Sequence, residues 1–258
     1  MSEPRVPLKT VKRAFDIIEL LKSMDSAGPT EISERMDLPK STVYESLCTL
    51  ESRGYLIKED GKYKISYKFL TIGGHRLLRN LPFQVAKPEL SRLAKETGEL
   101  VNFHIEERGQ SIIIHQVAGE NSLGIVVHPG MEGPLHTQAA GKVLLTHLPR
   151  DYSQKTLNSE LEKRTEKTIT DKEQLQGELE QIREQGYAID WDEQLIGMGV
   201  ASVPVFTQDD LIGALAIVCE TNKLKDQEFQ KEIVSKLQEA SNTISLNVQY
   251  GTDRALSR

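Results

Sequence analysis

The chain has 258 residues, of which 38% are hydrophobic and 27% are charged, and its formal net charge at pH 7 is -6. This length can form one large domain or two ordinary ones, each with a complete core. The sequence excludes a spanning helix, because it has no run of about 18 apolar residues, and a disulfide scaffold, because Cys48 and Cys219 are its only cysteines. The initial MSEPRVPLKTVKR lacks the apolar core of a secretory signal, so we expect a cytoplasmic protein.

The charge is unevenly distributed along the chain. Residues 1–80 contain 14 Lys and Arg against 11 Asp and Glu, a net of +3, whereas the remainder contains 18 against 27, a net of -9. Such asymmetry is typical of a small nucleic-acid-binding domain attached to an acidic partner domain. The excess is small, so it supports this organisation only together with the motifs that follow.

The first part of the chain has the spacing of three short helices. From Thr10 the apolar residues recur at helical intervals, which predicts a first helix with one buried stripe. The stripe consists of Val11, Phe15, Ile18 and Leu21. The segment AGPT ends this helix, and Thr30 is a suitable N-cap for a second one. The turn DLP then leads to a third helix, which should run from about Lys40 to Arg53 and end at Gly54.

Two strand-prone runs follow the third helix, in the sequence YLIKEDGKYKI. Asp60-Gly61 between them suits the positive φ angles of a two-residue hairpin turn. Three helices followed by a hairpin is the element order of a winged helix-turn-helix. This order predicts a DNA-binding domain in the N-terminal part of the chain.

The third predicted helix has an apolar side and a polar side. Val43, Leu47 and Leu50 lie within about 60° of one another, so they should face the core, with the hydroxyl residues opposite. A helix in the major groove needs such a face, because short polar side chains allow close approach to base edges. Basic residues at the helix ends and in the hairpin can reach phosphates. The predicted DNA-binding residues are Lys40, Ser41, Thr42, Glu45, Thr49, Arg53 and Lys62.

The alternative interpretation of this helix is a solvated surface in some other small bundle, since polar faces are common. The ordered set of three helices and an Asp-Gly hairpin favours DNA binding. Glu45 on the polar face is compatible with DNA, because a carboxylate can accept a hydrogen bond from N4 of cytosine.

The remaining sequence predicts a linker helix and a second domain. We place a DNA-binding domain at 1–68, the linker helix at 69–81 and the second domain at 82–258. Further helices are predicted at about 84–96, 138–147, 171–185 and 227–250. A capping box of Thr170 and Glu173 opens the third of these. Strand-like runs such as LVNFHIEE, QSIIIHQVAG and LIGALAIVC lie between the helices, which indicates an α+β sheet domain.

Three motifs resemble the IclR-type transcriptional regulators of bacteria and archaea. TVKRAFDIIELL…TEISERMDLPKSTVYESLCTLESRGYL is similar to their winged-helix domain, GPLHTQAAGKVLL to a segment of their effector domain, and DEQLIGMGVASVPVF with LIGALAIV to their final strands. The resemblance covers about Leu8 to Tyr250. It implies a GAF-like effector domain, homodimers or dimers of dimers on a pseudo-palindromic DNA operator, and control by a small, often acidic, metabolite. Asp37 and Val200 depart from the family pattern, which often has glycine and cysteine there.

The resemblance also implies an effector pocket in the second domain. Its walls would be formed by Leu135, Ala139, Ala140, Asp190, Met198, Val200, Ile217 and Cys219. In this hypothesis, backbone N–H groups at the start of a helix bind a ligand carboxylate, Asp190 accepts a hydrogen bond from a ligand hydroxyl, and the apolar wall sets the ligand size. The alternative is that the small residues only permit close packing of the helix on the sheet. We favour the pocket for the set as a whole.

The sequence has no motif of a cofactor site, a metal site or a catalytic centre. All six histidines lie between His75 and His147, but no pair has the tight helical spacing of a zinc site. No P-loop, GxGxxG or Ser/His/Asp order accompanies the predicted sheet. Cys219 ends an apolar strand, which favours inert packing over a reactive thiol. We therefore predict no cofactor, no metal and no enzymatic activity.

Three functions are compatible with these features. The first is a sequence-specific DNA-binding transcriptional regulator controlled by a small, carboxylate-containing effector. The second is a small-molecule sensor or enzyme of GAF type that uses the winged helix only for dimerisation. The third is a regulator that no longer responds to a ligand. The DNA-binding pattern of the third helix favours the first.

Overall fold

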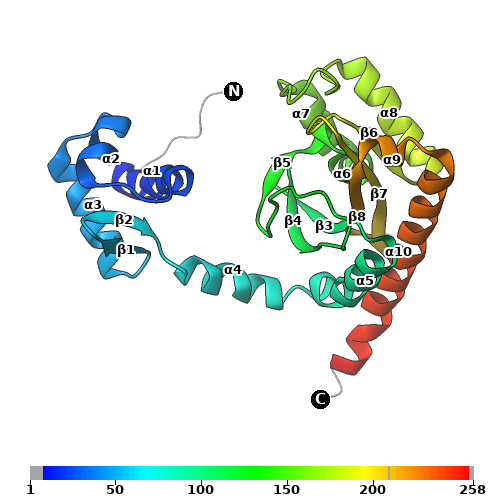
Figure 1. Cartoon of the computed structure of the whole chain (residues 1–258), viewed down its shortest axis with the longest axis horizontal. Coiled ribbons are helices and arrows are strands. Elements are labelled where there is room, and N and C mark those ends of the chain that lie inside the picture. The colour runs from blue at the N-terminus through cyan, green and yellow to red at the C-terminus, as the bar shows by residue number, and fades with distance from the viewer. Residues whose placement is uncertain (1–7, 209, 256–258) are drawn as a thin grey trace. The chain divides into compact units, whose positions relative to one another are not determined.

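The computed structural model describes residues 8–208 and 210–255. The chain divides into two compact units, residues 1–77 and 78–258. Helices and antiparallel strands occur in both units (Figure 1), so the α+β class predicted from the sequence is confirmed.

Residues 8–78 form four helices and a two-stranded hairpin. In chain order these are α1 (Lys9–Met24), α2 (Pro29–Met36), α3 (Lys40–Ser52), β1 (Leu56–Glu59), β2 (Lys62–Ile65) and α4 (Lys68–Leu78). α2 and α3 are joined by a short turn, and β1 and β2 form the wing (Figure 1). The predicted order of three helices and a hairpin is therefore confirmed.

One apolar core holds α1, α2, α3 and the wing together. Its buried side chains are Ile17, Leu21, Ala27, Ile32, Val43, Leu47, Leu50, Leu56 and Tyr63. Tyr63 of β2 also exchanges two backbone hydrogen bonds with Ala27, which lies between α1 and α2, at N···O distances of 3.0 and 2.8 Å. The wing is thereby fixed to the helices by both its side chain and its backbone.

The buried side of α1 differs from the stripe that its sequence predicts. The structure buries Ile17 and Leu21, whereas Val11 and Phe15 are 49% and 60% exposed. At about 100° per residue, the pair Val11 and Phe15 lies about 120° around the helix from the buried pair. The prediction that Val11 and Phe15 face the core was therefore wrong, because the apolar pattern of α1 covers two faces instead of one.

Two turns of this unit contain aspartates at positive φ. Asp37 ends α2 with φ of 52° and ψ of 48°, so an aspartate takes the left-handed conformation that glycine adopts most easily. Asp60 and Gly61 have φ of 49° and 79°, and they connect β1 to β2 with Glu59 opposite Lys62. The hairpin turn predicted from Asp60-Gly61 is confirmed.

The second unit contains an antiparallel sheet of six strands among its described residues. The strands are β3 (Leu100–Glu107), β4 (Gln110–Val117), β5 (Glu132–Pro134), β6 (Ala188–Trp191), β7 (Met198–Thr207) and β8 (Asp210–Glu220). Their spatial order is β5-β4-β3-β8-β7-β6. The helices are α5 (Leu81–Thr97), the 3-10 helix η1 (Leu135–Thr137), α6 (Ala139–His147), α7 (Arg150–Asn158), α8 (Lys172–Gln185), α9 (Thr221–Leu224) and α10 (Gln227–Ala255).

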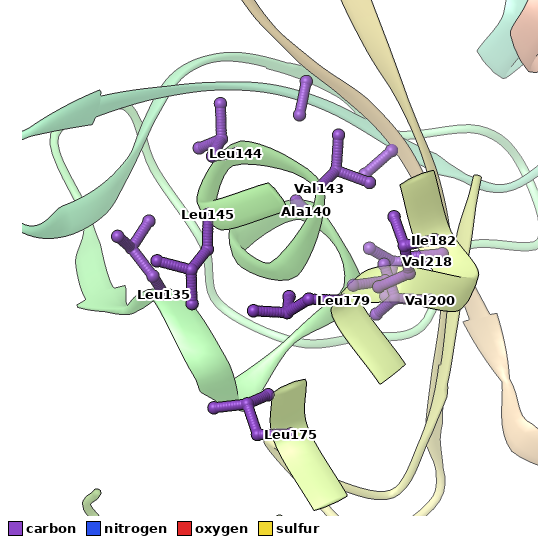
Figure 2. Packing of buried hydrophobic residues seen from close by; sticks show 14 of the residues in the cluster. Leu135, Ala140, Val143, Leu144, Leu145, Leu175, Leu179, Ile182, Val200 and Val218 are labelled. Carbon is purple, nitrogen blue, oxygen red and sulfur yellow. The ribbon is translucent and has the colours of Figure 1, made fainter. Parts of the chain in front are cut away.

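Helices cover both faces of this sheet. α6, with α8 packed against it, lies on one face, and α5 and α10 pack together on the other (Figure 1). Figure 2 shows the core on the α6 face of the sheet. α6 lies at its centre, with Leu135 of η1 and Leu175, Leu179 and Ile182 of α8 around it. A Cβ on Gly141 would come within 2.3 Å of the Leu135 backbone oxygen, so only glycine allows α6 to pack this closely on η1.

Several helix boundaries differ from the predicted ones. α7 has no predicted counterpart, and α4 ends at Leu78 where the linker helix was expected to continue. α8 is capped by Asp171, whose carboxylate accepts a hydrogen bond from Gln174 N at 2.8 Å, and not by the predicted box at Thr170. Among the described residues, no helix combines the length and the apolar character needed to cross a membrane.

Candidate functional site

α3 has one buried side and one exposed side. Val43 and Leu47 are fully buried. Of the predicted DNA-binding residues, Thr42 is half-buried, and the others, Lys40, Ser41, Glu45, Thr49, Arg53 and Lys62, are exposed. The structure therefore gathers all but one of them on α3 and its C-cap Arg53, with Lys62 on the wing.

Hydroxyl groups along α3 differ in the hydrogen bonds that they form. Thr49 Oγ1 donates to the Glu45 carbonyl oxygen at 2.8 Å, and Ser52 Oγ donates to the Thr49 carbonyl oxygen at 2.8 Å. Ser41 and Thr42 form no side-chain hydrogen bond in the part of the chain that the structure describes. The first-turn hydroxyls are therefore free to donate or accept, whereas Thr49 and Ser52 present lone pairs only.

The N-terminus of α3 is suited to bind an anion. Its N-cap is Pro39, and no side chain caps it, so the N–H groups of the first turn have no partner within the helix. Lys40 is exposed at the same end. Unpaired N–H groups, the positive end of the helix dipole and a lysine together favour a phosphate at this position.

Wing residues add positive charge to this unit. Lys62 is exposed and forms no ion pair within the described residues. Lys64 instead pairs with Glu59 at 2.6 Å, and Lys58 lies 5.3 Å from the ring centroid of Tyr63. Lys62 is therefore the wing lysine whose charge is least compensated.

Tyr44 was not among the predicted DNA-binding residues, but it is 52% exposed on α3. Interaction with the nearby Cys48 side chain raises the pKa of Tyr44. The two residues are four positions apart and therefore share a helix face. That spacing was the signal in the sequence that could have identified Tyr44 as part of the exposed surface.

The second unit contains a small cavity of about 80 Å³ beside the start of α6. Met198 and Val200, both predicted pocket residues, contribute to its apolar wall together with Val218. Residues that the sequence analysis did not identify form the remainder: Asn102, Ser111, Ile113, Ile125, Val127, Met131, Glu132, Gly133, Gln138 and Gln194. They come from β3, β4, the stretch 125–138 and the turn after β6, so no local pattern could have brought them together.

Two polar atoms at this cavity have no hydrogen-bond partner among the residues that the structure describes. The side-chain oxygens Oδ1 of Asn102 and Oε1 of Gln194 are buried without a hydrogen bond. Leaving such a group unpaired costs about 1–3 kcal/mol. Ser111, which also lines the cavity, is bonded to Nδ1 of His104 at 3.0 Å. The cavity thus has two unused acceptors in a largely apolar wall.

Asp190 has a different position from the one predicted. Its side chain is fully buried, and its Oδ2 accepts a hydrogen bond from the Ala139 backbone N–H at 3.0 Å. Burial, together with the nearby Glu193, raises the pKa of Asp190 to about 7. Asp190 does not line the cavity, and it connects β6 to the first turn of α6 instead.

The other predicted pocket residues lie beneath or behind the cavity wall. Leu135, Ala139 and Ala140 are fully buried in the core around α6. Ile217 and Cys219 do not line the cavity, because alternate residues of β8 point to opposite faces and Val218 between them faces it. Burial raises the pKa of Cys219 to about 12, so its thiol is un-ionised at neutral pH.

A buried lysine near the cavity connects α6 to α8 and to the residues after β6. Lys142 of α6 is fully buried and pairs with Glu178 of α8 at 2.7 Å and with Glu193, which follows β6. Burial also raises the pKa of Glu193, and the Lys142 ammonium opposes that shift. Because Asp190 lies beside Glu193, the start of α6 is held by a group of buried charges that neutralise one another in part.

The histidines have separate surroundings, and two of them, His115 and His147, have a buried Nε2 without a hydrogen bond among the described residues. His136 Nε2 contacts the Glu162 carbonyl oxygen at 2.9 Å, His128 Nδ1 contacts the Pro129 oxygen at 2.9 Å, and His115 packs edge-on against Phe83. Within residues 8–208 and 210–255, no three His, Cys, Asp or Glu side chains are placed to hold a metal ion.

Comparisons with known proteins identify the same family for both units. Residues 10–60 match the IclR helix-turn-helix domain, and residues 77–246 match the C-terminal domain of the bacterial transcriptional regulator IclR. The HTH-type transcriptional regulator KdgR of Escherichia coli K12 is 34% identical over 251 residues, which are 94% of each chain.

Solved structures show the same similarity. The crystal structure of Thermotoga maritima IclR has a TM-score of 0.77 and 31% identity, and it covers 93% of this chain and 99% of that one. An IclR homologue from Microbacterium hydrocarbonoxydans, solved with 4-hydroxybenzoate, has a TM-score of 0.79 and 21% identity over 93% and 98% of the two chains, which shows a shared fold. The relatives are named as transcriptional regulators and not as enzymes. The chain belongs to the IclR family and is a DNA-binding transcriptional regulator with an effector-binding domain.

Proposed function

We propose that α3 enters the major groove of an operator and that a small effector in the cavity beside α6 controls this binding. The DNA-binding part rests on one observation: α3 exposes a side that carries hydroxyl groups, opposite fully buried apolar residues. The N-terminus of the same helix has no side-chain cap. Ser41, Thr42, Glu45 and Thr49 would face base edges. Lys40, Arg53 and Lys62 would bind phosphates on either side of the groove. The protein would act in the cytoplasm, where the DNA of bacteria and archaea lies.

A second copy of the chain would complete the DNA-binding form. The exposed fractions of Leu8, Val11 and Phe15 are 64%, 49% and 60%. On α4, Leu70 and Ile72 are 69% and 51% exposed, and no residue of the helix is buried within the described part of the chain. Apolar surfaces of this kind favour an interface. A homodimer, alone or within a dimer of dimers, would present two copies of α3 to half-sites about 34 Å apart on a pseudo-palindromic operator.

The size of the cavity limits the effector. About 80 Å³ corresponds to roughly five to eight water-sized groups, so we propose an effector with on the order of six non-hydrogen atoms. The unpaired oxygens of Asn102 and Gln194 favour a ligand with hydroxyl donors. Gln138, the N-cap of α6, lines the cavity, and its side-chain amide can donate to a ligand carboxylate. A short hydroxy acid combines these features.

Control of DNA binding by the effector would be thermodynamic. A ligand that binds one arrangement of the subunits more tightly shifts the population toward that arrangement, and DNA then changes the ligand affinity by the same factor. The 4-hydroxybenzoate of the Microbacterium homologue also carries a carboxylate and a hydroxyl group. That ligand is larger than the cavity described above, so we propose a smaller acid for this chain.

The DNA-binding part can be tested with DNA from upstream of the gene that encodes the protein. Affinity measured by fluorescence anisotropy should fall steeply with salt, and Arg53→Ala or Lys62→Ala should each reduce the slope of log K against log salt by about one. Lys172→Ala, at the start of α8 in the second unit, is the charge-matched control and should leave the slope unchanged. The absence of a complex at about 50 mM salt, or a complex insensitive to salt, would rule out this proposal.

The effector part can be tested by thermal shift. Hydroxy acids of increasing length should be screened, and the effector should raise the melting temperature because it binds only the folded protein. Asn102→Leu removes an amide at the cavity and should abolish the shift. Ile217→Val changes a buried residue on the other face of the sheet and should retain it. A shift that survives in Asn102→Leu would place the ligand elsewhere.

A further inference from the structure

We propose that Glu45 determines which base pairs α3 accepts, because its carboxylate requires a cytosine amino group opposite it. The proposal rests on the DNA-binding function proposed above and adds the chemical basis of sequence discrimination. It concerns the energy difference between operator and other DNA, and not the overall affinity.

The first supporting observation is the isolated charge of Glu45. Its side chain is exposed near the middle of the polar side of α3 and forms no ion pair within the described residues. The nearby basic residues on this helix and its C-cap, Lys40 and Arg53, lie at the two ends. In the groove, the carboxylate would therefore meet the bases with no cation of its own chain beside it.

The second observation is the direction of the neighbouring hydrogen bonds. Thr49 donates its hydroxyl hydrogen to the Glu45 carbonyl oxygen, and Ser52 donates to the Thr49 carbonyl oxygen. Each keeps lone pairs as its only free hydrogen-bonding capacity. From Glu45 to Ser52, the polar side of α3 is consequently rich in acceptors and poor in donors.

Only some bases complement such a surface. In the major groove the donors are N4 of cytosine and N6 of adenine, whereas guanine and thymine present acceptors. The adenine amino group lies beside the acceptor N7, which repels the second carboxylate oxygen, but the cytosine amino group has no acceptor next to it on its own base. Cytosine is therefore the preferred partner of Glu45.

Glu45 would also weaken binding to other sequences. An unpaired carboxylate close to phosphates and to acceptor atoms is repelled, so every site without a suitable amino group is penalised. Specificity is the difference in affinity between the operator and other DNA, so weaker binding to other DNA increases it. Loss of the carboxylate should consequently strengthen non-specific binding while it weakens discrimination.

The test compares single base-pair substitutions in one operator half-site. Wild type should show a position at which C·G→T·A weakens binding by about tenfold or more. In Glu45→Gln that penalty should fall to less than about threefold, because an amide can both accept from cytosine and donate to O4 of thymine. Glu45→Ala should bind random DNA more tightly than wild type does.

Glu51→Gln is the matched control. It removes the same charge from the same helix, about 120° around the axis from Glu45, and Glu51 is likewise exposed. It should reproduce any general electrostatic gain but leave every base preference unchanged. Identical preferences in wild type, Glu45→Gln and Glu45→Ala would overturn the inference and leave DNA binding intact. A wild-type protein that prefers no sequence would instead overturn the proposed function.

Discussion

The polar side of α3 and the cavity beside α6 differ in how their residues are brought together. The α3 surface consists mainly of residues within one 13-residue helix, whereas the cavity collects residues from Asn102 on β3 to Val218 on β8. A helical repeat alone is sufficient to align the first set. The second depends on strand register and on which of two adjacent strand residues faces α6.

The two regions also differ in how their charges are compensated. Glu45 and Lys62 are exposed to solvent, so their replacement should change DNA binding more than stability. Lys142, Asp190 and Glu193 are buried, and they depend on one another. Mutations around the cavity should therefore change stability as well as ligand binding.

The largest loss of stability is expected for Lys142→Met. Removal of this ammonium leaves the buried carboxylate of Glu193 without its partner, which should reduce the free energy of unfolding by about 3–5 kcal/mol. Urea unfolding monitored by Trp191 fluorescence measures the loss in the second unit. Lys163→Met is the control, because its pair with Glu166 is solvent-exposed, so its loss should hardly change the free energy of unfolding. If both changes reduced the free energy of unfolding equally, burial would not be what makes the Lys142 ion pairs important.

A similar contrast is expected within α3 itself. Leu47 is fully buried, and Leu47→Ala should destabilise the first unit by about 2–5 kcal/mol. Ser41→Ala, on the opposite side, should change stability by less than about 0.5 kcal/mol but weaken operator binding. Hydrogen exchange of the α3 amides, together with anisotropy, separates the two effects. Fast exchange in Ser41→Ala would show that the exposed side also supports the fold.

Asp190→Asn should alter the pH dependence of stability. A carboxyl group whose pKa is raised to about 7 in the folded protein stabilises the fold when protonated, and this contribution is lost as pH rises from about 4 to about 7. Asparagine has no such loss, so the stability of the variant relative to wild type should increase over that range, by up to roughly 4 kcal/mol.

His104 changes the stability in the opposite direction with pH, and this contribution cancels when Asp190→Asn is compared with wild type. Burial lowers the pKa of His104 to about 4, so the folded protein loses stability as pH falls below about 6.5, in both proteins alike. Urea midpoints at several pH values provide the measurement. A difference that does not change with pH would show that Asp190 is ionised throughout.

Smaller losses of stability than those of Lys142→Met and Leu47→Ala are expected for two neighbours on β8. Val218→Ala and Cys219→Ala each truncate a buried side chain, and each should cost about 1–2 kcal/mol. Only Val218 lines the cavity, so only Val218→Ala should change the affinity for the effector. Isothermal titration with the acid found in the thermal-shift screen measures this difference. A change of affinity in Cys219→Ala alone would favour the predicted pocket over the observed cavity.

The sequence predicted local features more successfully than buried ones. It identified the three helices, the hairpin turn at Asp60-Gly61 and the two sides of α3, because each depends on residues close together in the chain. It assigned Val11 and Phe15 to the core, because the apolar residues of α1 cover two faces and periodicity does not show which face the core covers. Ile217 and Cys219 were placed at the pocket, although a shift by one residue reverses the face of a strand.

The sequence by itself determined that this chain has a winged helix-turn-helix followed by an α+β domain, and the motifs in their order indicated the family. Hydrophobic period, turn residues and helix ends encode these features locally. Only the tertiary structure decided that Asp190 holds the start of α6, that Lys142 is buried among carboxylates and that Asn102 and Gln194 present unpaired oxygens at one cavity. Those relations arise from packing between distant segments, where burial turns ordinary polar residues into groups that must be paired.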